Sequence, residues 1–467
     1  MNKNTRIPQS EIDKQYSYMA RVKSLIGSNK RAYIQTFGCQ QNEADSERLG
    51  GMLAEMGYEI IYSSQDADLI LVNTCAVREH AELKAMSITG GFKHLKEKNP
   101  SLIIGICGCM VTQEHRENNI KNSYPYIDIL FGTNMVYRFP EILYKTITAK
   151  KRQFWNNFND DGNIAEGLPV KREGGSKAWL SIMYGCNNFC TYCVVPYVRG
   201  RERSRQKEDI LAEARKLASE GIKEITLLGQ NVNSYGRDLG YEYDFADLLC
   251  DICKIEGDFR VRFMTSHPKD ATHKLIDVMA REDKIVKHFH LPLQSGDDRI
   301  LKVMNRHYDR DTYLSLIDYM RQKMPNIAIT TDIIVGFPGE TESEFENTLD
   351  ILRRVGFDNI YSFVYSKRKG TPAAEMDNQI SDEVKKTRIT RLLEVQNEIS
   401  QKINERLVGK VIQALVEGTS KTDPTKLTAR SEGNKLIHFE GSKELIGKQV
   451  KLRITKAGAY AMYGELE

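Results

Sequence analysis

Three cysteines, Cys186, Cys190 and Cys193, lie in the short segment GCNNFCTYC, separated by three and then two residues. A zinc ribbon would need a second cysteine pair or a histidine pair at ribbon spacing, and the sequence offers neither. A buried trio without metal is the alternative, but a loop rich in Gly and Asn favours thiolates that converge on a ligand. Three thiolates would bind three irons of a four-iron cluster. The spacing therefore predicts an iron–sulfur cluster whose fourth iron is open to a substrate or cofactor.

Three further cysteines each follow an apolar run that is typical of a strand: Cys39 after AYIQTFG, Cys75 after LILVNT and Cys109 after IIGICG. Loops at the carboxyl ends of parallel strands converge on one crevice, so these thiols could form a second three-cysteine group. Single cysteines after strands are also commonly buried apolar side chains. Cys107 is an alternative to Cys109, because it lies two residues away and on the same face of a strand.

Composition limits the remaining possibilities. The chain has 467 residues, of which 40% are hydrophobic and 28% charged, so we expect about three globular domains. An odd number of cysteines, nine, argues against a disulfide framework. Cys250 and Cys253 lie in an apolar helical pattern, where core or surface positions are expected and a metal or redox role is the lesser alternative. The polar residues 1–30 lack the apolar region of a secretory signal and no apolar run is long enough to span a membrane, which predicts a cytoplasmic protein.

The first half of the chain alternates short apolar runs with helical patterns. Strands are expected at 31–37, 67–73 and 102–107, and helices at 43–57 and 78–98. This alternation predicts a parallel α/β sheet. We expect a polar N-terminal tail over residues 1–30, an α/β domain over 31–149, and a connector rich in Gly, Asn and Asp over 150–171.

The second half contains six strand candidates separated by helical patterns, at 178–183, 224–230, 260–267, 288–295, 329–337 and 360–366. Six such units predict a partial (β/α)6 barrel over residues 172–404, with its active site at the carboxyl ends of the strands. A long helix at about 382–407 leads into short strands and turns. Residues 405–467 are therefore predicted to form a small all-β barrel.

The segment CNNFCTYC resembles the signature of radical S-adenosylmethionine (SAM) enzymes. In that family the methionyl amine and carboxylate of SAM bind the open iron, and one electron cleaves SAM to a 5′-deoxyadenosyl radical. The resemblance implies that Cys186, Cys190 and Cys193 hold a 4Fe–4S cluster and that Tyr192 contacts the adenine of SAM. It also implies that Gln230, in LLGQN, contacts SAM; the alternative for Gln230 is an ordinary turn residue.

The segments QTFGCQQNEADSE, VNTCAVREHAE and GCM resemble the N-terminal domain of the methylthiotransferases. This similarity implies that Cys39, Cys75 and Cys109 hold a second, auxiliary 4Fe–4S cluster. In the family's scheme one SAM methylates a sulfur carried on that cluster, and a second SAM provides the radical that removes hydrogen from the substrate. Because the hydrogen that is replaced is not acidic, no side chain acting as a base could perform this step, and a cofactor must carry it.

Further segments, TYCVVPYVRGRERSR, LLGQNVNSYG, TSHPKD and TDIIVGFPGET, most resemble the branch of the family that acts on tRNA. That branch methylthiolates carbon 2 of an N6-isopentenyl (dimethylallyl) adenosine next to the anticodon. The match covers about residues 31–467. Alternatives are a threonylcarbamoylated adenosine or a ribosomal-protein aspartate as substrate, and a non-enzymatic iron–sulfur carrier that binds RNA. The sequence departs from the family at Lys367 and Lys369, where prolines are usual.

Features of the chain agree with a tRNA partner. Arg199, Arg201, Arg203 and Arg205 alternate, so an extended segment would present them on one side to phosphates; a solvated, paired strand is the alternative. The C-terminal barrel resembles the TRAM domain, a small RNA-binding module. The resemblance further implies a one-electron donor of flavodoxin or ferredoxin type, and we expect a monomer with no membrane partner.

Overall fold

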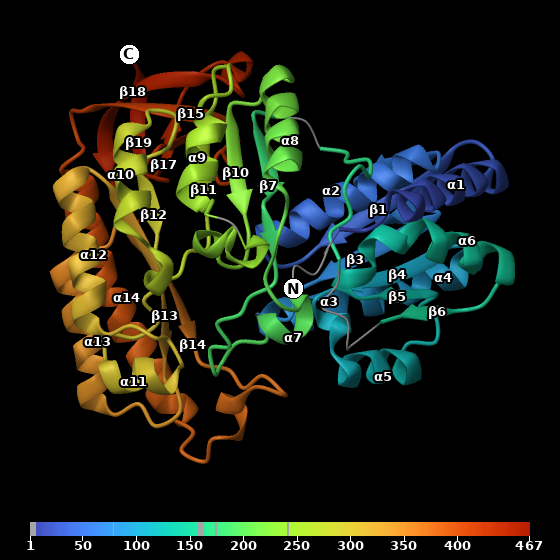
Figure 1. The fold of residues 1–467 in the computed structure, drawn as a ribbon, viewed down its shortest axis with the longest axis horizontal. Helices are drawn as coiled ribbons and strands as arrows, with labels where there is room; N and C mark the ends of the chain where they lie inside the picture. Colours follow the sequence, from blue (N-terminus) through green and yellow to red (C-terminus); the bar gives the residue numbers. More distant parts are fainter. Residues whose placement is uncertain (1–5, 78, 157–162, 173–174, 241) are drawn as a thin grey trace. The chain divides into compact units, whose positions relative to one another are not determined.

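The computed structural model describes residues 6–77, 79–156, 163–172, 175–240 and 242–467. The chain forms two compact units (Figure 1). Unit 1 contains Met1–Gly174 together with Met183–Asn187 and Cys193–Arg205, and unit 2 contains Gly175–Ile182, Asn188–Tyr192 and Gln206–Glu467. The chain therefore passes between the units inside the segment that carries Cys186, Cys190 and Cys193.

Unit 1 is built on a six-stranded parallel sheet with the strand order β2-β1-β3-β4-β5-β6. The parallel α/β fold predicted from the sequence is confirmed, and its three predicted strands are β1, β3 and β4. The strands are β1 (Lys30–Thr36), β2 (Tyr58–Ile61), β3 (Leu69–Thr74), β4 (Ile103–Gly108), β5 (Ile129–Phe131) and β6 (Gln153–Trp155), and the helices are α1 (Gln9–Ile26), α2 (Gln40–Glu55), α3 (Glu79–Gly91), α4 (Lys93–Lys98), α5 (Glu114–Ser123) and α6 (Phe139–Ala149).

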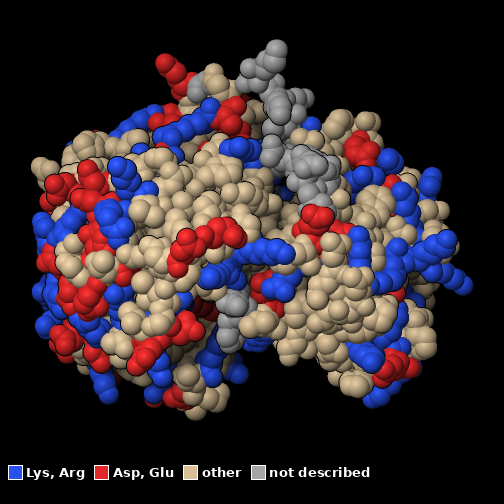
Figure 2. Space-filling model, turned by 90° about the horizontal axis from the view of Figure 1, so that it is seen from below, with Lys and Arg blue, Asp and Glu red and all other residues tan. Residues whose placement is uncertain are grey.

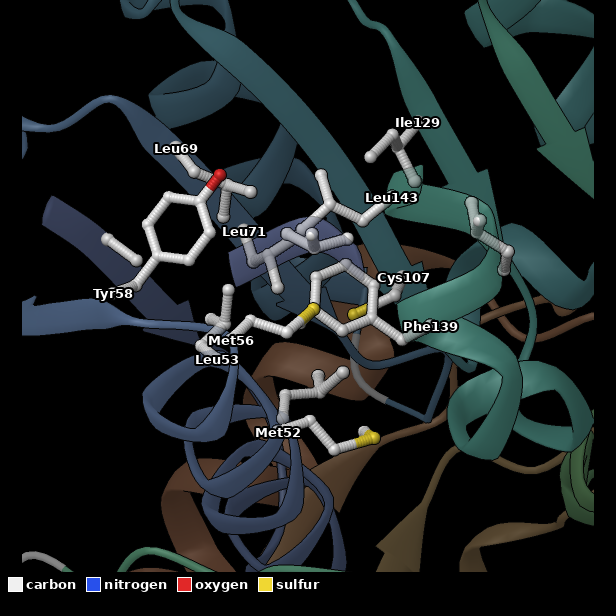
Figure 3. Packing of buried hydrophobic residues seen from close by; sticks show 14 of the residues in the cluster. Met52, Leu53, Met56, Tyr58, Leu69, Leu71, Cys107, Ile129, Phe139 and Leu143 are labelled. Atoms are coloured by element: carbon white, nitrogen blue, oxygen red, sulfur yellow. The ribbon is translucent and has the colours of Figure 1, made fainter. Parts of the chain in front are cut away.

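The sheet of unit 1 has an apolar core on each face, because the side chains of its strands alternate between the two faces. On β3, Leu69 and Leu71 pack in the core that helices α1, α2 and α6 share, whereas Ile70 and Val72 pack in the core on the opposite face. Figure 3 shows the first of these cores. Helix α1 lies within the segment expected to be a tail, and it buries a narrow stripe of side chains: Ile12, Gln15, Met19 and Val22.

Three short elements of unit 1 come from the segment after residue 182. Strands β8 (Met183–Tyr184) and β9 (Arg203–Ser204) form an antiparallel pair, and helix α7 (Val195–Arg199) lies between them in the sequence. A proline at the start of α7 suits a helix, because its missing N–H group would have no partner in the first turn.

Unit 2 begins with all six strands that the sequence predicted for the barrel. They form two parallel sheets of three strands, β11-β10-β7 and β12-β13-β14, and a bridge between Val261 and Ile285 continues the arrangement from one sheet towards the other. Helices cover the outside, which agrees with the predicted partial (β/α)6 barrel (Figure 1). The strands are β7 (Lys177–Ser181), β10 (Glu224–Leu228), β11 (Arg260–Phe263), β12 (His288–His290), β13 (Ala328–Val335) and β14 (Asn359–Val364); the helices are α8 (Lys207–Ser219), α9 (Phe245–Cys253), α10 (His273–Arg281), α11 (Asp298–Val303), α12 (Arg310–Lys323), α13 (Glu342–Val355) and α14 (Asp382–Glu405).

The last part of unit 2 is a closed five-stranded barrel with the order β15-β16-β17-β19-β18, as the sequence predicted. Closure leaves no free strand edge for unwanted pairing. Its strands are β15 (Val411–Thr419), β16 (Leu427–Ser431), β17 (Leu436–Phe439), β18 (Gln449–Ala457) and β19 (Ala461–Leu466). Within the described part of the chain, no helix is both long and apolar enough to cross a membrane. Figure 2 shows acidic and basic side chains next to one another around the rim of the face seen, with broad areas of other residues between them; the net charge is only +4.

Candidate functional site

Cys39, Cys75 and Cys109 follow three neighbouring strands of the unit 1 sheet. Cys39 lies between β1 and α2, Cys75 follows β3, and Cys109 follows β4. Since β1, β3 and β4 are adjacent and parallel, all three cysteines leave the sheet at the same edge. The convergence expected from the sequence is therefore present, and we call these residues the first trio.

Asn42, on the first turn of α2, connects members of the first trio. Its side-chain nitrogen donates to the carbonyl oxygens of Phe37 at 2.9 Å and Thr74 at 2.8 Å, which fixes the amide. Its oxygen then faces the sulfur of Cys39 at 3.7 Å and the sulfur of Cys109 at 3.8 Å. Two thiols of the first trio therefore contact the same oxygen atom.

Gly38 brings Cys75 to the same place. A Cβ atom at position 38 would lie 2.5 Å from the Cβ atom of Cys75 and 3.1 Å from its sulfur, closer than two side chains can approach. Its φ angle of +121° is also one that other residues rarely adopt. Only glycine therefore allows the loop after β1 to approach the loop after β3 so closely.

Cys107 has different surroundings from Cys109. Its side chain is fully buried and packs with Leu71 and Phe139 in the apolar core of unit 1 (Figure 3). Cys109 instead packs with Ala76, Val194 and Val198. The expectation that both cysteines share one strand face is wrong, because the strand ends at Gly108, whose positive φ angle of +96° interrupts the alternation.

The thiol of Cys109 is held in its protonated form by burial. Burial raises the pKa of the Cys109 thiol to about 12; Arg199 opposes this rise, and Cys75 and Cys39 add to it. A metal ion removes the proton from a thiol that coordinates it, so metal binding here would release protons.

The four alternating arginines do not form an exposed row, and that prediction is wrong. Arg199 ends helix α7, where its guanidinium donates to Asp45 at 2.9 Å and to Asn42 at 2.7 Å, and it is buried. Arg203, on β9, is also buried and donates to the carbonyl oxygens of Arg199 and Arg201.

Arg205 is buried too, and it forms a bidentate pair with Glu166 at 2.6 and 2.7 Å. Arg201 alone among the four is exposed. Arg199, Arg203 and Arg205 donate to carboxylates and backbone carbonyls of unit 1, so the segment does not present all four arginines to solvent. Phosphate binding by Arg201 stays a prediction, whereas the burial of Arg199 and Arg203 disfavours it for those two residues.

Cys186, Cys190 and Cys193 form the second trio; Cys186 and Cys193 belong to unit 1, and Cys190 belongs to unit 2. The backbone nitrogen of Cys186 donates to the carbonyl oxygen of Gly200 at 3.1 Å, which closes the segment that contains Cys193 and α7. The sulfur of Cys190 accepts a hydrogen bond from Arg306 at 3.4 Å. Sequence reasoning missed Asn42 and Arg306, because no local pattern links a polar side chain to a cysteine that lies far away in the sequence.

The two residues expected to contact SAM lie in unit 2. Tyr192 is half-buried and packs against an apolar group that includes Met304 and Phe337. Gln230 follows the carboxyl end of β10 and is half-buried, the position expected for a ligand-binding residue of such a barrel. Their contacts with SAM stay predictions.

Among the residues that the structure describes, no group of three or more His, Cys, Asp or Glu side chains could hold one metal ion. Cys250 and Cys253 lie on helix α9, where Arg281 donates to the sulfur of Cys250 at 3.1 Å and burial raises the pKa of Cys253 to about 12.

Comparison with known proteins follows the same division of the chain. The Radical SAM superfamily matches residues 180–352, the uncharacterized protein family UPF0004 matches residues 31–132, and the TRAM domain matches residues 405–466. The radical SAM methyltransferase TsrM from Kitasatospora setae, a solved structure, has a TM-score of 0.54 at 13% identity and covers 74% of this chain and 75% of its own, so the two share a fold.

Curated relatives match the whole chain. A protein of Thermoanaerobacter sp. (strain X514) is 50% identical over 467 residues, 100% of this chain and 99% of its own. A protein of Alkaliphilus oremlandii is 51% identical over 469 residues, with the same coverage. Both are named tRNA-2-methylthio-N(6)-dimethylallyladenosine synthase. Identity of this extent, together with the three matched domains, shows that the chain belongs to the tRNA-2-methylthio-N(6)-dimethylallyladenosine synthase family of radical SAM enzymes.

Proposed function

We propose that this enzyme methylthiolates carbon 2 of N6-isopentenyl adenosine next to the anticodon of tRNA, using two molecules of SAM. The observation that carries the proposal is the identity of about half of all residues with synthases of that name over the full chain. The geometry is consistent with it, because the first trio follows three adjacent parallel strands and the second trio lies in the segment after strand β8.

Each cysteine trio would hold one 4Fe–4S cluster. Cys186, Cys190 and Cys193 would bind the cluster that receives SAM, with Tyr192 and Gln230 directed to SAM. Cys39, Cys75 and Cys109 would bind the auxiliary cluster. When bound, these groups supply the methyl group, the sulfur and the radical that removes hydrogen, chemistry that no side chain offers.

The residues of the chain do the remaining work. Gly38 allows the loop after β1 to lie against Cys75, and the side-chain oxygen of Asn42 contacts the thiols of Cys39 and Cys109. These two residues therefore bring the first trio together. The apolar group formed by Ala76, Val194 and Val198 around Cys109 keeps water away from that side of the site. Exclusion of water protects a reactive intermediate from side reactions.

The C-terminal barrel supports a tRNA substrate. Register places Thr428, His438, Tyr463 and Lys456 in one row across four neighbouring strands. Tyr463 is 40% exposed, and the amino groups of Lys426 and Lys456 lie 5.5 and 6.0 Å from the centre of its ring. An exposed aromatic ring between lysines suits RNA, since bases stack on the ring and phosphates attract the ammonium groups.

Three further points belong to the proposal. A one-electron donor of flavodoxin or ferredoxin type supplies the electron that SAM cleavage requires. The enzyme works as a monomer. It is cytoplasmic, since its substrate is tRNA.

The test is an anaerobic reaction of the reconstituted protein with SAM, reductant and tRNA, followed by mass spectrometry of the nucleosides. The tRNA is supplied in two forms, with and without the isopentenyl group. We expect a methylthio mass increment only on the isopentenylated adenosine. Cys190→Ser, which removes one thiolate of the SAM-binding trio, should abolish both the increment and the release of 5′-deoxyadenosine.

Two outcomes would contradict the proposal. Release of 5′-deoxyadenosine without any increment on tRNA would retain a radical enzyme but reject the substrate. An increment on tRNA without the isopentenyl group would reject the assigned nucleoside.

A further inference from the structure

The segment after helix α11 holds the loop of the second trio. The backbone nitrogen of Thr191 donates to the carbonyl oxygen of Met304 at 3.1 Å, and the Thr191 hydroxyl donates to that of Val303 at 3.0 Å. The side chain of Asn305 donates to the carbonyl oxygens of residues 188 and 189, both at 3.1 Å. Four hydrogen bonds within unit 2 therefore fix the backbone on both sides of Cys190.

Arg306 extends this segment to the sulfur itself. Its side chain is only 4% exposed, and one terminal nitrogen donates to the sulfur of Cys190 at 3.4 Å. The other terminal nitrogen donates to the carbonyl oxygen of Pro292 at 2.7 Å, and Nε donates to the hydroxyl of Tyr308 at 3.0 Å. Since contacts on several sides orient the planar guanidinium, it is fixed in front of Cys190.

Among the described residues, no carboxylate forms an ion pair with Arg306. Burial opposes the charge of Arg306, whereas the phenols of Tyr308 and Tyr192 and the thiol of Cys190 favour it and raise its pKa. A buried charge without a partner is costly, and proteins normally pair it. The group in contact with Arg306 that becomes negative when a cluster binds is Cys190.

Arg199, the buried arginine beside the first trio, differs from Arg306 because it has a carboxylate partner. Arg199 lies near Cys39 and Cys109 through Asn42, but its guanidinium forms an ion pair with Asp45 at 2.9 Å. Its positive charge is therefore compensated without the cysteines. The two trios lie beside buried arginines of the same type, one neutralised by a carboxylate and one not.

We propose that Arg306 is a positioning residue that supplies the counter-charge of the SAM-binding cluster through Cys190 and favours the reduced form of that cluster. This inference depends on the proposed function, which assigns a cluster to the second trio. A cluster becomes more negative when it accepts an electron. A fixed positive charge beside one of its thiolates therefore stabilises the reduced state more than the oxidised state.

The test is a redox titration of the full-length, reconstituted protein followed by electron paramagnetic resonance. The SAM-binding cluster is identified as the signal that changes when SAM is added. Arg306→Gln removes the charge and keeps a polar side chain, whereas Arg306→Lys keeps the charge. Arg321→Gln is the matched control, since Arg321 is a half-buried arginine of the same unit that donates to the backbone carbonyls of Val355 and Gly356 at the end of α13.

At the midpoint potential of the wild-type cluster, Arg306→Gln should lower the ratio of reduced to oxidised SAM-binding cluster about tenfold, a shift of about 59 mV for one electron. The signal that does not respond to SAM should stay unchanged. Arg306→Lys and Arg321→Gln should each stay within about threefold of the wild-type ratio.

An unchanged midpoint in Arg306→Gln, or an equal shift of both clusters, would overturn the inference. If Arg306→Gln loses its iron, Arg306→Lys decides: a retained cluster with a wild-type midpoint supports the role of charge, and loss of iron from both variants overturns it. A wild-type protein without any SAM-responsive cluster would refute the proposed function, whereas a SAM-responsive cluster that ignores Arg306 refutes this inference alone.

Discussion

Glu224 is a buried, paired carboxylate whose removal should lower the stability of unit 2. It begins strand β10 and is 2% exposed. Arg260 donates to it at 2.7 Å, Arg262 donates to it at 3.1 Å, and the amino group of Lys177 lies 3.5 Å away. Lys177, Glu224 and Arg260 are the first residues of their barrel strands, at the end that stabilises such folds and not the end that binds substrate.

The same arginines also connect the partial barrel to the C-terminal barrel. Arg260 donates to the carbonyl oxygen of Arg430 at 3.1 Å, and Arg262 donates to those of Ser431 and Glu432. Glu224 therefore orients the two side chains that bind strand β16 and the turn after it. Glu224→Gln should weaken the attachment of the C-terminal barrel as well as the charge network.

The magnitude follows from the pKa of Glu224. Burial alone would raise that pKa, but Arg262, Lys177 and Arg260 outweigh burial and lower it from 4.5 to about 2. At 1.36 kcal/mol per pKa unit, the ionised carboxylate contributes about 3 kcal/mol at neutral pH. Removing one partner of a buried ion pair typically costs roughly 3–5 kcal/mol, which agrees.

Thermal unfolding and urea titration at pH 7 measure this effect. Glu224→Gln should lower the free energy of unfolding by about 3 kcal/mol and the melting temperature by roughly 6 °C. Glu220→Gln is the control, because Glu220 is 45% exposed and 3.9 Å from Lys216, so its loss should cost less than about 0.5 kcal/mol.

The pH dependence gives an independent check. Because the folded-state pKa is lowered, the stabilisation by Glu224 is complete above pH 4.5 and is lost as the pH falls towards 2. The difference in stability between wild type and Glu224→Gln should therefore shrink below pH 4.5. Equal losses for Glu224→Gln and Glu220→Gln at pH 7, or a difference that does not change in acid, would refute the reasoning.

Three more predictions concern the sites. Cys109→Ser should lose the iron of the auxiliary cluster, whereas Cys107→Ser should keep both clusters and lose only stability. Iron analysis after reconstitution measures this difference, and equal iron loss in the two variants would contradict the assignment. Tyr463→Ala should weaken tRNA binding by about 1–3 kcal/mol and leave 5′-deoxyadenosine release unchanged, whereas Tyr62→Ala, at an exposed tyrosine of unit 1, should bind tRNA like wild type. Arg201→Ala should reduce the slope of log affinity against log salt by about 1 if Arg201 binds a phosphate, and an unchanged slope would exclude that contact.

Most of the fold could be predicted from the sequence, because long apolar runs bounded by turns fix the strands. All six barrel strands occur where expected, and residues 405–467 contain the small all-β barrel that their short strands and turns predict. Strands β2, β5 and β6 were missed, since three or four residues each are too few to show a pattern. Helix α1 was missed because its buried stripe is narrow and interrupted by a polar residue, Gln15, in an otherwise polar segment.

Part of the site could be predicted from spacing, and part depends on contacts that no local pattern contains. The three cysteines of the second trio are adjacent in sequence, so their spacing is informative. The ion pair between Arg199 and Asp45 joins residues 154 positions apart, and the alternation of arginines gave no sign of it. The alternation predicts an extended row of arginines, whereas helix α7 turns the chain and Arg199 at its end is buried.

The position of α7 also explains why the two compact units do not follow the order of the domains along the chain. Cys193 ends the segment that resembles the radical SAM signature, yet residues from Cys193 to Arg205 pack with unit 1. Val194 and Val198 contact Cys109 and Ala76, and Arg199 reaches Asn42 beside Cys39. One short segment therefore carries a cysteine of the second trio and forms part of the surroundings of the first. Three of its arginines are buried because they pair with carboxylates and backbone carbonyls that hold this segment in unit 1, so their charges act in packing and not in an exposed phosphate-binding row.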